Sequence, residues 1–577
     1  MINYDDIVRD LEDRGYRIEE SIFLDQSCLT VTLNIDNNKI ELIHFKLNQL
    51  TEMPSFFVKN PLALGRLAHI SLYEIQGEEL GGFCVNTPDS LSINFDRPAL
   101  VFEETLERYE KLLTEVITDE VFNKSEQLRE FQAHWLNIYT DSNKKIICTS
   151  ESGDFEVLDI YAPSFEYGLG SYYIADSKES ELTVFFETVL KNNSKKTERK
   201  RGYVLPLQSL SPAPWCKEEL SDYYRNCLSQ LSEKDYTLFR NQSGYRSDEF
   251  WLMFNAPTPS GKTWFCIYLK LKDRKSKKSL PINREALDKW DISAIEIISF
   301  NRELVMPRSG AEVALSDKKV LLVGGGSVGG EIAEKLASSG LGFLDMIDPD
   351  CFSLDNLFRH TLDLNSLNRP KTSALQIKLL GKNPWLNTRA FYDKLLILTR
   401  NELIKRLESY DLIIIAIGNP THERLFSRKL KESNINVPVI NTWVEGYGVG
   451  GHAILDVSTS KGCLYCAYTD SLGINGLNSN LNFLKADQNL TKNHGGCGSA
   501  FLPYSGLSAS QTALIATDLA LKYLLEEITE SSKISWKGSE VKAKEEGFEL
   551  TDRYYLFQES LMPLSLHNPL CDFCNVN

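Results

Sequence analysis

The chain has 577 residues, 42% of them hydrophobic and 25% charged, so it can bury several cores and we expect two to four domains. Its formal net charge of −16 at pH 7, with basic runs that lack interleaved aromatic residues, argues against a nucleic-acid partner. No apolar run reaches the roughly 20 residues that a membrane span requires, and the first residues do not resemble a signal peptide, so we expect a cytoplasmic protein with no membrane partner.

Residues 1–125 are predicted to form an α+β domain. Apolar spacing predicts two helices with strands between them, at Tyr4 to Arg14, Cys28 to Ile35, Lys39 to Phe45 and Phe102 to Val116. A proline-containing segment (53–61), His69 and Cys84 lie between the strands and the second helix. This order resembles that of ubiquitin-conjugating enzymes, and the resemblance makes Cys84 a candidate catalytic thiol. The alternative is a small α+β domain with an incidental cysteine, which would be buried, whereas a nucleophile must reach solvent.

Residues 126–299 are predicted to form a mixed α/β linker domain. Strands are expected at Lys145 to Ser150, Trp251 to Phe254 and Thr263 to Leu271, and helices at Glu181 to Lys191 and Glu218 to Leu231. Two polar basic runs, Lys191 to Arg201 and Lys270 to Lys278, are typical of solvated loops. We expect this region to position the neighbouring domains or to dock a partner protein.

An apolar strand, Val320 to Val323, opens the most informative stretch. It leads into Gly324, Gly326 and Gly329, spaced as G-x-G-x-x-G, and a helix and a second strand that ends at Asp348 follow. Glycines at this spacing let the backbone approach a phosphate or a ribose, and an acidic residue about 20 positions on can hold ribose hydroxyls. The pattern therefore predicts a Rossmann-like nucleotide-binding domain.

Polar and cationic residues crowd the chain just past this second strand. Asp350, Asn356, Arg359 and Lys371 follow it, and two cations with an amide suit a triphosphate better than a nicotinamide ring. Together with the glycine loop they resemble the adenylating domain of ubiquitin-activating enzymes and of their bacterial ThiF/MoeB-type relatives, which activate sulfur-carrier proteins. The resemblance covers residues 300–577 and implies ATP and Mg²⁺ as cofactors. The alternative is a generic Rossmann domain with another ligand.

Two details of this resemblance concern single residues. The segment 301–303 (Asn-Arg-Glu) resembles the family's Asn-Arg-Gln arm, whose arginine reaches the ATP of a partner subunit, so Arg302 is a catalytic candidate and a homodimer is expected. The family follows a later strand with Asp-Asn, whereas here Gly418 stands in place of that Asp, and Asn419 remains as a nucleotide-binding candidate. Magnesium would then be held by Asp348, by Asp350 or by the nucleotide itself.

Two Cys-x-x-Cys pairs lie far apart in the sequence, Cys463 with Cys466 and Cys571 with Cys574. Each hairpin can present two thiolates to one tetrahedral metal, and two hairpins close a four-sulfur structural Zn²⁺ site. Such a site would attach the C-terminal segment to the body of the domain, as the resemblance also implies. The alternative is a set of reduced cysteines in turns.

A further thiol, Cys497, lies among glycines and small residues ahead of an apolar helix expected at about Ser508 to Leu525. A helix N-terminus favours a thiolate, and glycine neighbours leave room for an acyl partner. Cys497 is therefore a candidate thioester-forming nucleophile, as in ubiquitin-activating enzymes, and His494 is a candidate to assist it. The alternatives are a buried cysteine in a tight turn and a hydrogen-bonded loop histidine.

A conjugating-like domain ahead of an activating-like domain resembles the bacterial fusion enzymes of anti-phage CBASS operons. The resemblance implies an ATP-dependent ligase that adenylates the C-terminus of a substrate protein, a cyclic-nucleotide synthase. Cys497 would capture the acyl group, Cys84 would accept it by thioester exchange, and an amine of an acceptor protein would receive it. Two alternatives stay open: a single-step activator of a sulfur-carrier or ubiquitin-like protein in which Cys84 is dispensable, and a nucleotide-binding scaffold without activity.

Overall fold

The computed structural model describes residues 2–85, 93–94, 96–138, 144–162, 171–177, 182, 200–273, 279–282, 287–393, 407–493, 500–558 and 564–571. The predicted helix at Glu181 to Lys191 (apart from residue 182) and three predicted functional residues, His494, Cys497 and Cys574, lie outside this range. The chain forms two compact units, of which the first ends at Asn301 and the second begins at Arg302.

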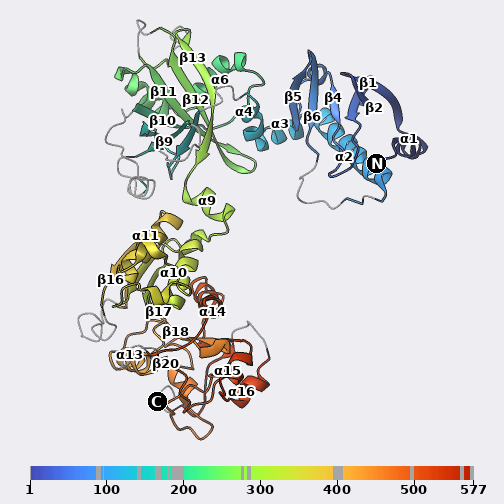
Figure 1. Ribbon diagram of the computed structural model, residues 1–577. Helices are drawn as coiled ribbons and strands as arrows, with labels where there is room; N and C mark the ends of the chain where they lie inside the picture. The colour runs from blue at the N-terminus through green and yellow to red at the C-terminus, as the bar shows by residue number, and fades with distance from the viewer. Residues whose placement is uncertain are drawn as a thin grey trace. The chain divides into compact units, whose positions relative to one another are not determined.

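The N-terminal part of the first unit is a six-stranded antiparallel sheet (Figure 1). In spatial order its strands are β1 (Arg17–Phe23), β2 (Gln26–Ile35), β3 (Asn38–Phe45), β4 (Phe57–Lys59), β6 (Glu78–Phe83) and β5 (Ile70–Ile75). Helices α1 (Tyr4–Asp13) and α2 (Pro98–Thr118) share one apolar core with the sheet, in which Ile7, Leu42 and Phe102 are buried. Helix α2 begins earlier than the sequence predicts because Pro98 occupies its first turn, where an N–H is not needed.

The rest of the first unit is built around a closed barrel. Its strands, in spatial order, are β10 (Lys200–Pro206), β11 (Glu249–Thr258), β12 (Gly261–Leu271), β13 (Trp290–Ser299), β7 (Lys144–Cys148), β9 (Ser171–Asp176) and β8 (Glu156–Tyr161). The barrel closes because β10 pairs with β11 on one side and with β8 on the other. Helices α4 (Phe131–Asn137), α6 (Leu220–Ser229) and α7 (Glu233–Asn241) share its apolar core, and α3 (Glu120–Arg129) joins α2 to α4.

The second unit contains an eight-stranded sheet. Its order is β16 (Asn387–Phe391), β15 (Phe343–Ile347), β14 (Lys319–Val323), β17 (Leu412–Ile415), β18 (Val439–Val444), β19 (Gly450–Asp456), β22 (Ser532–Lys537) and β23 (Leu564–Ser565). The first five strands are parallel, and the last three pair antiparallel. Along β14, Val320 and Leu322 enter the core on one face and Leu321 and Val323 the core on the other, as expected for a strand buried on both sides.

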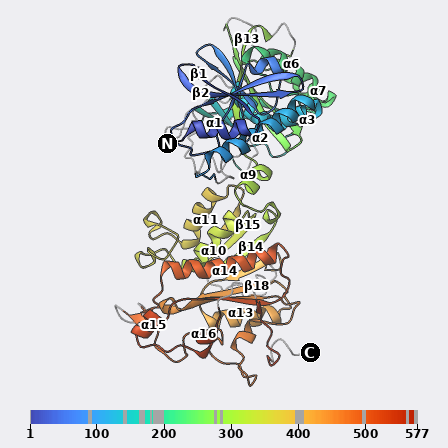
Figure 2. The same cartoon turned by 90° about the vertical axis from the view of Figure 1, so that its right-hand side faces the viewer.

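Helices cover both faces of this sheet. Helices α10 (Ser327–Ser338), α11 (Lys371–Lys382) and α14 (Gly506–Leu524) pack into one core, and α13 (Pro420–Glu432) packs into the other. Figure 2 shows α14 lying lengthwise beside β18, which it contacts. Helix α9 (Arg302–Arg308) begins the unit, and α15 (Val541–Glu545), α16 (Asp552–Leu556) and the pair β20 (Lys492–Asn493) and β21 (Ala500–Phe501) complete it. The carboxyl ends of β14, β15 and β17 lie at one edge of the sheet, where ligands of such folds bind.

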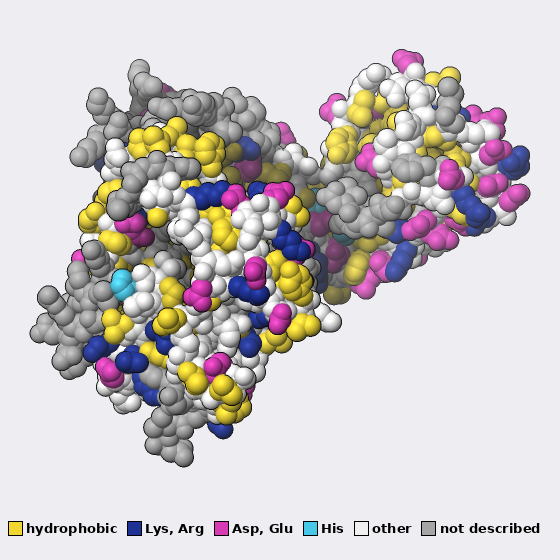
Figure 3. Space-filling view, turned by 60° about the horizontal axis from the view of Figure 1, so that its bottom comes forward, with side chains coloured by type: hydrophobic (Ala, Val, Ile, Leu, Met, Phe, Trp, Pro, Cys, Tyr) yellow, Lys and Arg dark blue, Asp and Glu magenta, His cyan; other side chains and the backbone are white. Residues whose placement is uncertain are grey.

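No helix within the described residues combines the length and the apolar character needed to cross a membrane. On the face of the molecule that Figure 3 presents, basic, acidic and hydrophobic side chains are interspersed.

Candidate active site

The glycine-rich loop follows β14 and leads into α10. Gly324 has a φ of +99°, and a Cβ there would lie 2.6 Å from the carbonyl oxygen of Ala416, just past β17. A Cβ on Gly329 would lie 1.8 Å from the carbonyl oxygen of Gly324, so α10 approaches the loop as closely as only glycine permits. At Gly326 a Cβ would meet no described atom within 4 Å. The loop is therefore tightly packed at its outer glycines and open at the middle one.

Asp348 holds this loop from the end of β15. Its Oδ2 accepts a hydrogen bond from the N–H of Gly325 at 2.6 Å, and its Oδ1 accepts one from the N–H of Asp350 at 2.7 Å. Burial raises the pKa of the Asp348 carboxyl, and these bonds and the charge of Lys371 act against that rise. Lys371 begins α11 and donates from Nζ to Oδ2 of Asp350 at 3.1 Å, while the Asp350 side chain stays 66% exposed. Asp350 is thus the carboxylate that a cation such as Mg²⁺ reaches more easily.

A cleft of about 1520 Å³ opens at this edge of the sheet. Four predicted residues line it: Asp350, Asn356, Arg359 and Lys371. The guanidinium of Arg359 lies 4.8 Å from the ring centre of Tyr504, another lining residue, and its buried Nε has no hydrogen-bond partner among the described residues. A buried guanidinium N–H without an acceptor suits an anionic oxygen such as that of a phosphate. The structure therefore brings the two predicted cations and the amide together around one cavity.

Six other predicted residues of this site are not part of the described lining of the cleft: Gly324, Gly326, Gly329, Asp348, Arg302 and Asn419. Arg302 is the first residue of α9. Asn419 is the exposed N-cap of α13, and its Oδ1 accepts a hydrogen bond from the N–H of His422 at 3.1 Å. Gly418 has a φ of +63°, a conformation that glycine adopts more easily than aspartate.

Sequence reasoning missed Glu423, a buried carboxylate behind the turn at Gly418. It is 2% exposed, and its Oε1 accepts a hydrogen bond from the N–H of Asn419 at 3.1 Å. Burial raises the pKa of Glu423 to about 7, although the backbone N–H groups of Asn419 and Gly418 act to lower it. The available signal was a glutamate in the first turns of a helix, where such side chains reach back to the N-cap.

Cys84 follows β6 in the first unit and is exposed. Its N–H donates to the carbonyl oxygen of His69 at 2.9 Å, and His69 has a φ of +63°. Two carboxylates hold the His69 ring, with Nδ1 2.6 Å from Oε1 of Glu130 and Nε2 3.3 Å from Oε2 of Glu126. Burial lowers the pKa of His69, but the bonds to and charges of Glu130 and Glu126 raise it above its usual value. Cys84 thus has the exposure that a nucleophile needs and a core cysteine lacks.

Three of the four predicted metal-ligating cysteines lie together. The Sγ of Cys463 is 3.9 Å from that of Cys466 and 3.8 Å from that of Cys571, and all three residues are buried. Sulfurs about 2.3 Å from a tetrahedral Zn²⁺ lie about 3.8 Å apart, so this spacing fits three ligands of such an ion. The N–H of Leu464 donates to Oδ2 of Asp456 at 3.0 Å and so fixes the turn of the first pair.

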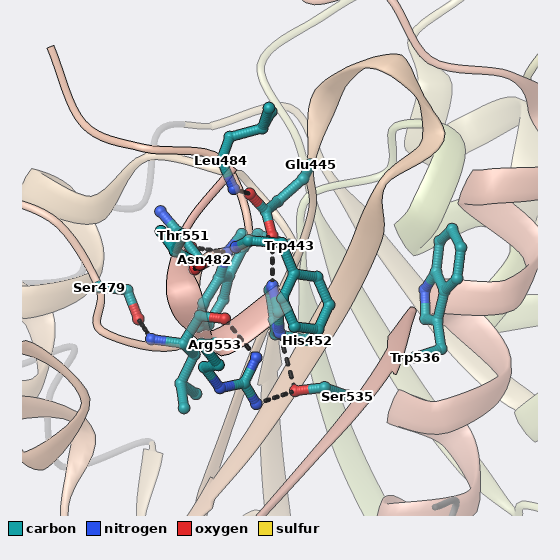
Figure 4. A network of polar contacts seen from close by, with 12 residues as sticks. Trp443, Glu445, His452, Ser479, Asn482, Leu484, Ser535, Trp536, Thr551 and Arg553 are labelled. Carbon is teal, nitrogen blue, oxygen red and sulfur yellow. Dashed lines mark hydrogen bonds and ion pairs between the residues drawn. The ribbon is translucent and has the colours of Figure 1, made fainter. Parts of the chain in front are cut away.

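The second unit also contains a buried polar network that sequence reasoning missed (Figure 4). Glu445 accepts hydrogen bonds from His452 Nε2 at 2.8 Å and from the N–H groups of residues 483 and 484. Ser535 Oγ lies 2.8 Å from His452 Nδ1 and accepts a bond from Arg553. The hydrogen-bonded series Ser535, His452 and Glu445 resembles the catalytic triad of a hydrolase. However, Ser535 is only 4% exposed and already accepts a hydrogen bond from the Arg553 guanidinium. The network therefore joins the segment at 481–484 and α16 to the sheet and carries no exposed nucleophile.

The parallel sheet, the packed glycine loop and the acidic residue at the end of β15 are the features of a Rossmann-like α/β domain. A profile described as the ThiF family matches residues 300–545, so the C-terminal half of the chain contains a ThiF family domain.

Three curated proteins illustrate what the chain is similar to. The "ATP-dependent ubiquitin transferase-like protein Cap2" of Escherichia coli (strain TW11681) is 27% identical over 224 residues, 38% of this chain and 36% of that protein. The protein of the same name from Vibrio cholerae is 27% identical over 216 residues, 36% of each chain. The "Molybdopterin-synthase adenylyltransferase" of Escherichia coli (strain K12) is 30% identical over 149 residues, 24% of this chain and 58% of that protein. The match thus spans about a third of the length of the first two relatives.

Proposed function

We propose that this chain activates the C-terminus of a substrate protein by ATP-dependent adenylation in the cleft. The observation that carries the proposal is the convergence of Asn356, Arg359 and Lys371 on one cavity, which is also lined by Asp350, two residues after the aspartate that holds the glycine loop. The buried Nε of Arg359 and the Nζ of Lys371 provide cationic donors for a triphosphate. The names of two relatives, an adenylyltransferase and a ubiquitin transferase-like protein, support the same chemistry.

In this reaction a carboxylate oxygen of the substrate's C-terminus attacks the α-phosphorus of ATP. The bond between that phosphorus and the oxygen that bridges to the β-phosphate breaks, pyrophosphate leaves and an acyl-adenylate remains. The protein contributes mainly position and charge neutralisation, which we assign to Arg359 and Lys371, with Asn356 orienting the phosphates. Mg²⁺ fits beside Asp350 and, when bound, would neutralise phosphate oxygens. A cleft of about 1520 Å³ exceeds the roughly 300–1,000 Å³ of small-molecule sites and leaves room for a peptide tail.

Two thiols would then carry the acyl group. The thiolate of Cys497 attacks the acyl carbonyl and AMP leaves; the thiolate of Cys84 next attacks the new thioester and releases Cys497. An amine of an acceptor protein attacks the second thioester, which leaves an amide and a free Cys84 thiol. Each step exchanges one activated acyl group for another, so the energy of ATP is retained until the amide forms. The exposure of Cys84 supports its place in this order.

The partners follow from the resemblance to the CBASS fusion enzymes. We propose a cyclic-nucleotide synthase as the substrate protein and a homodimer in which Arg302 reaches the nucleotide of the partner subunit. The three clustered cysteines, with Cys574, are proposed to hold a structural Zn²⁺ that fixes the C-terminal segment, a role the distances between their Sγ atoms support. The runner-up is a single-step activator of a sulfur-carrier or ubiquitin-like protein, which needs the cleft but not Cys84.

Thioester capture tests the proposal. Wild type, Cys497→Ala and Cys84→Ala would be mixed with Mg·ATP and a cyclic-nucleotide synthase from the same host, and adducts compared on non-reducing gels. We expect a thiol-sensitive adduct in wild type, a retained adduct in Cys84→Ala without the final amide product, and none in Cys497→Ala. If Cys84→Ala makes the final product at the wild-type rate, the conjugating step is wrong and the single-step activator is the better account.

A further inference from the structure

Both backbone polar groups of Gly325, at the centre of the glycine loop, are held by side chains. Its N–H donates to Oδ2 of Asp348 at 2.6 Å, as described above. Its carbonyl oxygen lies 2.8 Å from Nε2 of His360, a residue 35 positions later in the chain. A loop that must present its backbone to a ligand gains order when two successive peptide groups are each fixed by a hydrogen bond.

The hydrogen bonds of His360 determine which of its nitrogens carries the proton. The backbone N–H of Leu362 donates to Nδ1 at 3.1 Å, so Nδ1 is an acceptor. In a neutral imidazole the proton is then on Nε2, which donates to the carbonyl oxygen of Gly325. Burial, together with the charges of Lys371 and Lys378, lowers the pKa of His360 to about 4. The ring is therefore a neutral donor at physiological pH, with its tautomer set by its partners.

The surroundings of His360 are shaped to admit this ring. It is 9% exposed and packs edge-on to Phe352, with 5.3 Å between ring centres. A Cβ on Gly330 of α10 would lie 2.8 Å from Cγ2 of Thr361 and 3.3 Å from Cε1 of His360, so the glycine after the motif leaves space for both side chains. The N–H of His360 also donates to the carbonyl oxygen of Asn356 at 2.9 Å. One residue thus connects the glycine loop to the turn that carries Asn356 and Arg359.

We propose that His360 is a positioning residue for the nucleotide. Its Nε2–H donates to the Gly325 carbonyl oxygen and so fixes the position of the glycine loop relative to the turn that carries Arg359. The inference rests on the proposed function, because it assumes that the nucleotide lies between these two segments. The simpler explanation is a core histidine that only satisfies its own hydrogen bonds. The two explanations differ in what happens when one of the two ring nitrogens is replaced selectively.

Two substitutions separate the contacts. The amide nitrogen of His360→Gln falls where Nε2 is now and can still donate to Gly325, whereas the amide of His360→Asn falls where Nδ1 is now and keeps only the contact to Leu362. Losing one neutral hydrogen bond weakens a dependent binding step by roughly 3- to 10-fold. We expect the Kd for Mg·ATP, measured by calorimetry on the full chain, to rise by that factor in His360→Asn and to stay within twofold of wild type in His360→Gln.

Amide hydrogen exchange of the peptide that contains residues 320–330 gives a second readout, one that needs no nucleotide. We expect faster exchange in His360→Asn than in His360→Gln at similar melting temperatures. Equal Kd values and equal exchange in the two variants would overturn the inference and leave a core histidine. If wild type itself binds no Mg·ATP, the proposed function fails and the nucleotide-positioning role fails with it. The exchange comparison still shows in that case whether His360 orders the loop.

Discussion

Alanine at Gly329 should disrupt the second unit, because its Cβ has no space. The added Cβ would lie 1.8 Å from the carbonyl oxygen and 2.9 Å from the carbonyl carbon of Gly324, whereas real Cβ contacts are essentially never below 3.0 Å. Helix α10 would have to move by more than 1 Å, and it carries Ile332 and Leu336 of the main core. Overpacking of this kind costs about 1–3 kcal/mol, and we expect the upper end because the clash is with backbone.

Gly326→Ala is the matched control, three residues away in the same loop. A Cβ there meets no described atom within 4 Å and the φ of Gly326 is −74°, so the fold should tolerate it. About 3 kcal/mol corresponds to a fall of roughly 6–12 °C in the melting temperature of a domain of this size. Scanning calorimetry of the full chain should show that fall for Gly329→Ala and less than about 2 °C for Gly326→Ala. Calorimetric titration with Mg·ATP should show weaker binding for Gly326→Ala, because its methyl group enters the open side of the loop.

Equal melting temperatures for the two variants would refute the packing argument. A Gly326→Ala protein that binds Mg·ATP as tightly as wild type would instead show that the ligand does not approach the middle of the loop.

Two further outcomes follow from buried groups. The pKa of Glu423 is raised to about 7, so ionising it opposes folding: the stability that its neutral form provides is complete below about pH 4.5 and is lost as the pH rises through 7. Between pH 5 and pH 8, the free energy of unfolding of Glu423→Gln, measured with denaturant, should therefore rise by on the order of 2–3 kcal/mol relative to that of wild type. The exposed Glu432→Gln on the same helix should show no such rise. Parallel pH profiles for Glu423→Gln and wild type would contradict this. We expect elemental analysis to find zinc in wild type and in the exposed control Cys216→Ser, and to find none in Cys571→Ser, which should also melt at a lower temperature than both. Zinc-free wild type would exclude the four-cysteine site.

Local sequence patterns predict much of the second unit. The apolar run at Val320 to Val323, the spaced glycines and Asp348 predict a strand, a loop and a second strand, because a buried strand and a tight glycine turn each leave a local pattern in the sequence. The same reasoning places Arg359 and Lys371 near this loop, since parallel strands bring their carboxyl ends to one edge. The ThiF profile match supports this part of the sequence reasoning.

Features that depend on distant segments were not predictable in this way. The barrel closes through the pairing of β8 with β10, and no local pattern in either strand specifies that partner. Asn419 caps α13 just after Gly418, whose φ is positive, and its role as a nucleotide ligand stays a prediction. The hydrogen bond from Arg553 to Ser535 joins α16 to β22, and no residue spacing within either element predicts that the two lie together.

The release of pyrophosphate tests the central claim most directly. Wild type, Lys371→Ala and Lys382→Ala would be incubated with Mg·ATP and the cyclic-nucleotide synthase; the two lysines are the first and last residues of α11, and only Lys371 lines the cleft. We expect substrate-dependent pyrophosphate from wild type and from Lys382→Ala, and at least a tenfold loss in Lys371→Ala, because a buried cation next to the phosphates is removed. Pyrophosphate release by Lys371→Ala at the wild-type rate would contradict adenylation in this cleft.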